Sequence, residues 1–251
     1  MRLLQAELLK IRTAPRTAIG LLLALLGLVG LGSGATARSD DEAPAPFAIE
    51  TSVSDILDVA SIAVIFALIL GILAVTWEYR HGTIISTFLA TPRRERVIGT
   101  KLVVGAVAGA LLAVLSVVVS LGVASFWIDV ELERDHWELI GRIVLGTAAW
   151  AVLGVGVGAL IQSQVGAIVA ALVWFLVAEP LLGLPLDEVA DYLPGAALDR
   201  LMGVDEEAVE GPGGPSVEHA YSLGVAALLT IAYAAGFALL GIISAVRRDV
   251  P

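Results

Sequence analysis

The sequence contains no cysteine, which excludes disulfide bonds, thiolate metal sites and thiol chemistry. It also lacks a G-x-x-x-x-G-K-[ST] phosphate loop, an H-E-x-x-H zinc motif and a G-x-S-x-G nucleophile motif. Its three histidines, His81, His136 and His219, fall in loops on both sides of the predicted membrane spans, so they cannot form one metal site. We therefore predict no catalytic residue, no cofactor, no metal and no enzymatic activity, including no ATPase site of its own.

Charge is scarce over long stretches of the chain. Hydrophobic residues make up 58% of the 251 residues, and the mean hydropathy is +0.90. Uncharged runs of about 18 or more residues are long enough to cross the hydrocarbon core of a bilayer. We therefore predict an all-α membrane protein with a single transmembrane domain over residues 1–251. Its six transmembrane helices are expected at about 17–34, 56–76, 102–126, 143–161, 165–184 and 222–246.

The distribution of charge predicts the orientation. If both termini share one side, that side holds eleven Lys and Arg residues and four acidic residues, Glu7, Glu78, Glu95 and Asp249. The opposite side holds four basic and twenty acidic residues. Because Lys and Arg are enriched in cytoplasmic loops, both termini are predicted to be cytoplasmic. The expected location is the plasma (cytoplasmic) membrane, as a multi-pass protein.

Residues 1–16 have the pattern of an amphipathic helix, with Leu4, Leu8 and Ile11 on one face. We predict that this helix lies in the membrane interface against anionic headgroups. An alternative is open, because the basic start, the apolar run and the small residues at 35–37 are also typical of a secretory signal peptide. The intact mass of the purified protein distinguishes the two.

Between spans 2 and 3 lies 77–101, the longest polar break on the basic side. Four apolar residues in it recur at helical spacing: Ile84, Ile85, Phe88 and Leu89. Pro92 ends this pattern and is suited to the first position of a following helix. We predict a short amphipathic helix held between two spans. The alternative is a loop that only satisfies the charge bias and contacts lipid headgroups.

Only one ionisable residue, Glu179, lies inside a predicted span, directly before Pro180. It is about fourteen residues, or roughly 21 Å, from the cytoplasmic start of span 5. A buried carboxylate there is expected either to line a translocation path or to stabilise a helix break at Pro180. It is equally expected to reach the outer interface or to hydrogen-bond a neighbouring helix.

Two small-residue motifs, Gly105-xxx-Gly109 and Gly154-xxx-Gly158, permit close approach of helices. We predict that both serve packing within the chain rather than a subunit interface.

Three stretches carry a resemblance to a known family: MRLLQAELLKIRTAPRTAIG at the start, EYRHGTIISTFLATPRRERVIGTKL after span 2, and FLVAEPLLG followed by DYLPGAALDRL late in the chain. With six spans in the same order over essentially the whole length, the chain resembles the permease subunit of ABC-2-type transporters, an export-type ATP-binding cassette family. The resemblance implies an N-terminal helix on the cytoplasmic membrane face and short re-entrant elements between spans 5 and 6, within 180–201.

The same resemblance implies a cytoplasmic coupling helix, between spans 2 and 3, that docks on an ATPase subunit. Carried over by position, its start falls at Glu78, Arg80, His81, Gly82 and Thr83. Its apolar stripe includes Ile84, Phe88 and Leu89, and its end falls at Pro92, Arg93 and Arg94.

The expected function is therefore the permease subunit of an ABC transporter, which moves a lipid, drug-like or peptide substrate across the membrane. Its expected partners are a separate ATP-binding cassette ATPase, a second permease copy in a homodimer or heterodimer, and the lipid bilayer, but not nucleic acid. Glu179 is the candidate residue of the translocation path. Two alternatives are a self-sufficient secondary transporter or channel, and a non-transporting membrane anchor that recruits a cytosolic partner.

Overall fold

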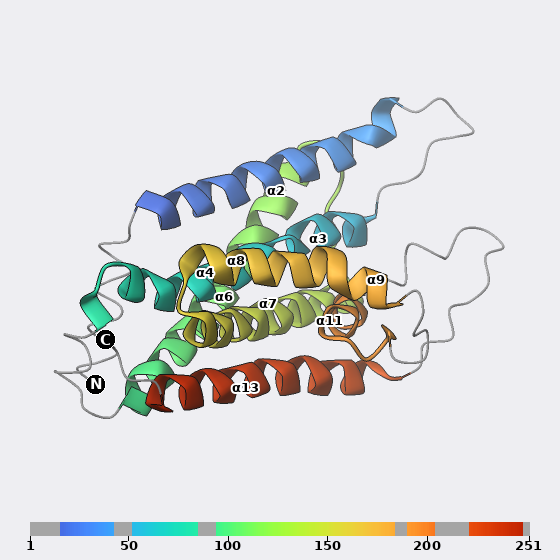
Figure 1. Cartoon of the computed structure of the whole chain (residues 1–251). Coiled ribbons are helices and arrows are strands. Elements are labelled where there is room, and N and C mark those ends of the chain that lie inside the picture. The colour runs from blue at the N-terminus through green and yellow to red at the C-terminus, as the bar shows by residue number, and fades with distance from the viewer. Residues whose placement is uncertain (1–15, 43–51, 85–93, 184–189, 204–220, 248–251) are drawn as a thin grey trace.

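The computed structural model describes residues 16–42, 52–84, 94–183, 190–203 and 221–247, and regular structure in these ranges is helical throughout (Figure 1). Six helical segments in them are long and apolar enough to cross a membrane: Thr17–Arg38, Val53–Arg80, Glu95–Ala124, Arg134–Ile161, Gln164–Leu182 and Leu223–Arg247. The predicted all-α fold with six candidate spans is confirmed.

The elements follow one another along the chain without strands in the described ranges. They are α2 (Arg16–Glu42), α3 (Val53–Ser61), α4 (Ala63–Arg80), α6 (Arg94–Ala124), α7 (Arg134–Ile161), α8 (Gln164–Val173), the π-helical turn η1 (Trp174–Ala178), α9 (Glu179–Gly183), α11 (Pro194–Met202) and α13 (Leu223–Arg247). Ile62 separates α3 from α4 within one span. The N-terminal helix predicted for residues 1–16 lies outside the described residues, apart from Arg16.

Several helices are longer than the predicted spans. The second span was expected to end near 76 and the third to begin near 102, but α4 continues to Arg80 and α6 begins at Arg94. The fourth helix begins at Arg134 rather than near 143. Hydropathy detects only the apolar part of a helix, whereas Arg and Glu are good helix formers that extend it beyond the hydrocarbon.

Basic residues predominate at one end of the bundle and acidic residues at the other. At one end, here called the basic end, α2 begins, α4 ends, α6 begins and α13 ends. Its basic residues include Arg16, Arg80, Arg94, Arg96 and Arg247. The opposite, acidic end carries Asp55, Asp58, Asp129, Glu131, Glu133, Asp135 and Glu138. This separation is the one expected from the sequence; the orientation of the two ends in a membrane stays a prediction.

Helix α7 is the centre of the bundle, and glycines bring its backbone against two neighbours. A Cβ atom added at Gly154 would lie 2.2 Å from Leu68 O of α4, and one added at Gly71 of α4 would lie 2.1 Å from a carbonyl oxygen of α7. On another face, a Cβ at Gly156 would lie 2.5 Å from Phe237 C of α13. Such contacts tolerate no side chain, so α4, α7 and α13 are held at backbone contact.

Both small-residue motifs pack inside the chain, as predicted. Gly154 and Gly158 face α4. Gly105 and Gly109 of α6 face α7, where a Cβ at Gly109 would lie 2.7 Å from Ala151 Cβ. The motifs therefore join helices of one subunit.

Serine side chains join α2, α3 and α6 within the apolar bundle. The hydroxyls of Ser33 and Ser120 share a hydrogen bond of 2.6 Å. Ser120 also donates to Ile56 O at 2.7 Å, and Ser116 donates to Ala60 O at 2.8 Å. All three hydroxyls are buried, and each has a hydrogen-bond partner, as polar groups inside an apolar bundle require.

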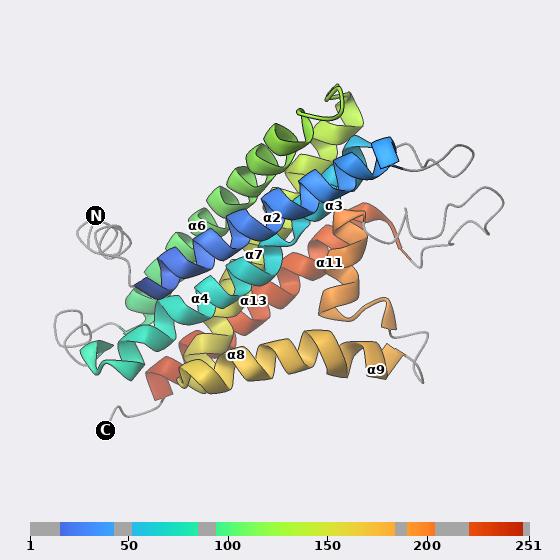
Figure 2. The same ribbon diagram turned by 90° about the horizontal axis from the view of Figure 1, so that it is seen from above.

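Between spans 5 and 6, α11 lies across the bundle, since Figure 1 shows it end-on where α7 and α13 are seen from the side (Figures 1 and 2). It begins with Pro194 and ends at Gly203, whose φ of 78° is the left-handed conformation that glycine tolerates. Leu198 and Met202 are buried against α7. Two short elements, α9 and α11, thus occupy the region where re-entrant elements were expected; their depth in a membrane stays a prediction.

Candidate functional site

The candidate site lies at the basic end, where α4 ends at Arg80 and α6 begins at Arg94. The loop between them contains most of the predicted amphipathic helix. Residues 85–93, which include Phe88, Leu89, Pro92 and Arg93, lie outside the described residues, so their predicted docking role is not tested by the structure. Thr83 and Ile84, at the start of the predicted helix, have helical backbone conformation.

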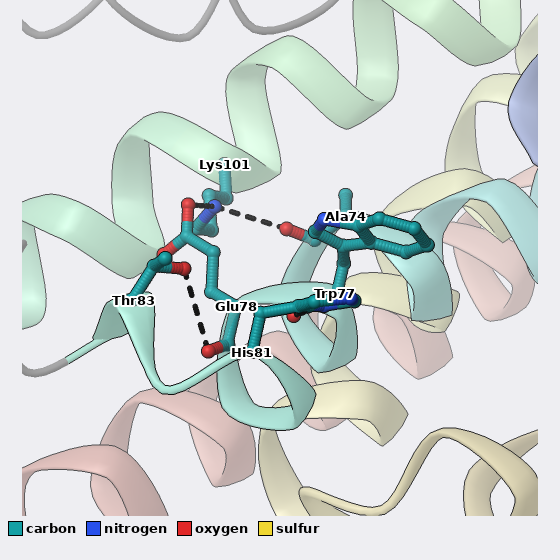
Figure 3. Close-up of polar contacts among 6 residues, drawn as sticks. All are labelled: Ala74, Trp77, Glu78, His81, Thr83 and Lys101. Carbon is teal, nitrogen blue, oxygen red and sulfur yellow. Dashed lines mark hydrogen bonds and ion pairs between the residues drawn. The ribbon is translucent and has the colours of Figure 1, made fainter. Parts of the chain in front are cut away.

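A buried ion pair joins the two helices that flank this loop (Figure 3). Lys101 Nζ of α6 donates to Glu78 Oε1 of α4 at 2.8 Å and to Ala74 O at 2.9 Å. The two side chains are only 1% and 7% exposed. Because separating a buried pair leaves an uncompensated charge in a medium of low polarity, the pair keeps the ends of α4 and α6 together.

Lys101 is the residue of the candidate site that sequence reasoning missed, because it was taken only as the boundary of the polar stretch. The sequence did contain a signal that Lys101 faces the interior of the bundle. Lys101, Gly105 and Gly109 recur every four residues and therefore share one helical face. A lysine on the same face as two close-packing glycines is directed into the bundle rather than toward solvent, and it requires an acidic partner there.

The end of α4 is fixed by local hydrogen bonds that the sequence encodes. His81 Nδ1 donates to Trp77 O at 2.9 Å, and the two rings stack with their centroids 4.2 Å apart (Figure 3). Gly82 follows with a φ of 67°, which ends the helix in the manner of a left-handed C-cap. The Thr83 hydroxyl donates back to Glu78 O at 3.5 Å.

The site extends to the turn between α7 and α8. Gln162 Nε2 donates to Tyr79 Oη at 3.3 Å, and Arg80 Nη1 donates to Gln164 Oε1 at 3.1 Å. Ile84 is buried against Val97 and Tyr79 within the chain. Of the residues predicted in the coupling helix, Glu78 and Ile84 thus contact α6 and Arg80 contacts the start of α8, whereas the hydrogen bonds of His81 and Thr83 are to α4.

Glu179 lies at the other end of the molecule and is not part of this cluster (Figure 1). Its Oε1 accepts hydrogen bonds from the backbone N–H groups of Gly195 at 2.5 Å and Ala196 at 3.0 Å, which cap the N-terminus of α11. Of the two expectations for this residue, hydrogen bonding to a neighbouring helix is what the structure shows. A role in a translocation path stays a prediction.

Comparison with known proteins assigns no family to the chain: no family model matches it, and no curated protein matches it.

Proposed function

We propose that this chain is the permease subunit of an ABC-2-type transporter, working in the plasma membrane with its basic end in the cytoplasm. In this proposal a separate ATPase subunit binds the 85–93 loop, and a second permease copy completes the path for the substrate. Six candidate spans, the separation of charge between the two ends and the family resemblance of the sequence support it.

The observation that carries the proposal is the buried Glu78–Lys101 pair. The pair lies directly beside the loop and connects the last turn of α4 to the second turn of α6. A force applied to the loop would therefore move both spans together. A loop that only contacts lipid headgroups has no need of a buried ion pair, whose desolvation is costly.

The hydrogen bonds of Tyr79 and Arg80 extend this connection to the α7–α8 turn. Four spans would then respond to one docking event, because α4, α6, α7 and α8 all meet at this end (Figure 2). Packed elements that shift as rigid bodies are a common means of transmitting such a change.

The test is co-purification of the ATPase with the tagged chain, followed by ATP-driven transport in vesicles. Phe88→Asp places a charge on the predicted docking stripe and should reduce the recovered ATPase about tenfold or more, since buried aromatic anchors dominate interfaces. Val246→Asp is the matched control, because Val246 is 50% exposed at the same end and lies on α13, outside the loop.

Unchanged ATPase recovery and unchanged transport with Phe88→Asp would contradict the docking role. Robust transport in vesicles that contain no ATPase would favour a self-sufficient transporter or channel. Recovery of the ATPase without any transport would favour a membrane anchor.

A further inference from the structure

Glu179 has one carboxylate oxygen that its capping role does not use. Oε1 accepts both hydrogen bonds from α11, whereas Oε2 is buried and, apart from the side chain of Trp174, has no hydrogen-bond partner among the described residues. The whole residue is only 7% exposed. Buried polar atoms without partners are uncommon, and a carboxylate oxygen facing apolar groups is costly. Capping uses only Oε1, and one indole N–H does not use both lone pairs of the second oxygen, so Oε2 keeps acceptor capacity for a further ligand.

The backbone before Glu179 directs the side chain to this position. Residues Trp174–Ala178 form a π-helical turn, and the Glu179 N–H donates to Trp174 O, five residues earlier. A π-helical turn contains an extra residue, so it changes the direction of all later side chains on the helix. Such turns occur frequently at functional sites. Here it turns Glu179 toward the N-terminus of α11.

The approach of Glu179 to α11 depends on a glycine. A Cβ atom added at Gly195 would lie 2.7 Å from Oε1 and 3.0 Å from Oε2 of Glu179. Residue 195 thus leaves room for the whole carboxylate group.

Aromatic and apolar residues flank Glu179 along the same helical segment. The Trp174 side chain hydrogen-bonds to the carboxylate, and the residue is 42% exposed. Phe175 packs on Trp150 of α7, with the ring centroids 4.2 Å apart and the rings tilted by 42°. Leu176 and Leu181 are 62% and 59% exposed. An exposed indole face attracts organic cations, and the leucines offer a surface for an apolar body.

We propose that Glu179 is the binding site for the cationic group of an amphiphilic substrate that enters from the membrane. The cation pairs with Oε2 when α9 and α11 separate, its apolar part lies against the membrane-facing leucines, and Trp174 contacts the cation. The inference rests on the proposed permease function, and it narrows the substrate class to lipophilic cations. Anionic substrates are disfavoured because the negatively charged carboxylate would repel them.

The test uses the purified chain alone, in nanodiscs of zwitterionic lipid, with equilibrium dialysis against empty nanodiscs. Tetraphenylphosphonium and tetraphenylborate are the probes, because they match in size and shape and differ in the sign of their charge. The wild-type chain should bind the phosphonium saturably and about tenfold or more tightly than the borate.

Glu179→Gln keeps an oxygen for the α11 cap and should lose about tenfold in phosphonium affinity. Glu138→Gln removes a charge from an exposed position at the same end and should leave the affinity unchanged. Equal phosphonium affinity in wild type and a folded Glu179→Gln protein would overturn the inference, as would equal affinity for both probes.

Gly195→Ala provides a second variant in case Glu179→Gln does not fold. It keeps the charge but displaces the carboxylate from α11, so the phosphonium should bind several-fold more tightly. Unchanged affinity in a folded Gly195→Ala protein would also overturn the inference. No ATPase is present in this assay, so its failure refutes only the substrate class, whereas failure of ATPase docking refutes the permease proposal.

Discussion

Lys101→Met is the most direct perturbation of the candidate site. It removes the cation of the buried pair and leaves the Glu78 carboxylate buried without its Lys101 partner. Because the two side chains are only 1% and 7% exposed, solvent cannot replace the lost partner. Breaking a buried pair from one side costs about 3–5 kcal/mol. For a chain of this size, that cost corresponds to a fall in Tm of roughly 6–20 °C.

A double variant separates the loss of the pair from the loss of either charge. Glu78→Met/Lys101→Met replaces both residues with unbranched apolar side chains of similar length, so no charge remains buried. Replacing a buried pair in this way is often neutral or stabilising. The double variant should therefore recover most of the Tm that Lys101→Met loses, which is a strong non-additive effect between contacting residues.

The assay is thermal unfolding of the chain in nanodiscs at one fixed heating rate, followed by the fluorescence of its five tryptophans. Arg134→Met is the control. It breaks an exposed ion pair of 3.4 Å with Glu138, whose side chains are 90% and 63% exposed, and should change Tm by less than about 2 °C. If Lys101→Met also changed Tm by so little, or if the double variant were the least stable, the buried pair would not hold α4 to α6.

Other predictions concern the packing and the orientation. Gly71→Ala should destabilise the bundle by about 1–3 kcal/mol in the same assay, because its Cβ would lie 2.1 Å from a backbone oxygen, whereas Gly27→Ala has nothing within 4 Å and should be silent. Ser120→Ala should cost about 0.6 kcal/mol, the average for a hydrogen bond between membrane helices, and full retention of Tm would contradict its bridging role. Since the chain has no cysteine, a membrane-impermeant thiol reagent should label intact cells at Glu138→Cys but not at Glu95→Cys; the reverse pattern would invert the proposed orientation.

The six spans could be predicted because hydropathy depends only on local composition. The ends of the helices could not be predicted in this way, since charged residues extend the helices beyond the apolar run. Arg80 does so at the end of α4, and Arg94 and Arg134 do so at the starts of α6 and α7. The α11 helix has recognisable signals, with Pro194 at its start and Gly203 after its end, but its transverse direction is set by packing on α7 and α13.

The candidate site was predicted in part. Position along the chain placed Glu78 and Arg80 beside the loop, but the partner of Glu78 is 23 residues away, and only the folded bundle shows that pairing. That Glu179 hydrogen-bonds a neighbouring helix was one of the expectations left open by the sequence, but the helix it would contact was not predicted. The π-helical turn that directs Glu179 has no sequence signal that we recognise, because it depends on a shift of one residue in the hydrogen-bond ladder.

The close packing of α7 gives the two distant sites a common physical route. Glu78 lies on α4, whose Gly71 is in backbone contact with α7; farther along α7, a Cβ added at Gly146 would lie 2.7 Å from Met202 Cε of α11, the helix that Glu179 caps. These contacts form a continuous path of close packing from α4 at the basic end to the acidic end. If docking of a partner and binding of a cation both use this route, thermodynamic linkage makes the effect reciprocal. Each ligand then changes the affinity for the other by the same factor, so a saturating cation should strengthen or weaken ATPase docking as much as docking changes cation binding.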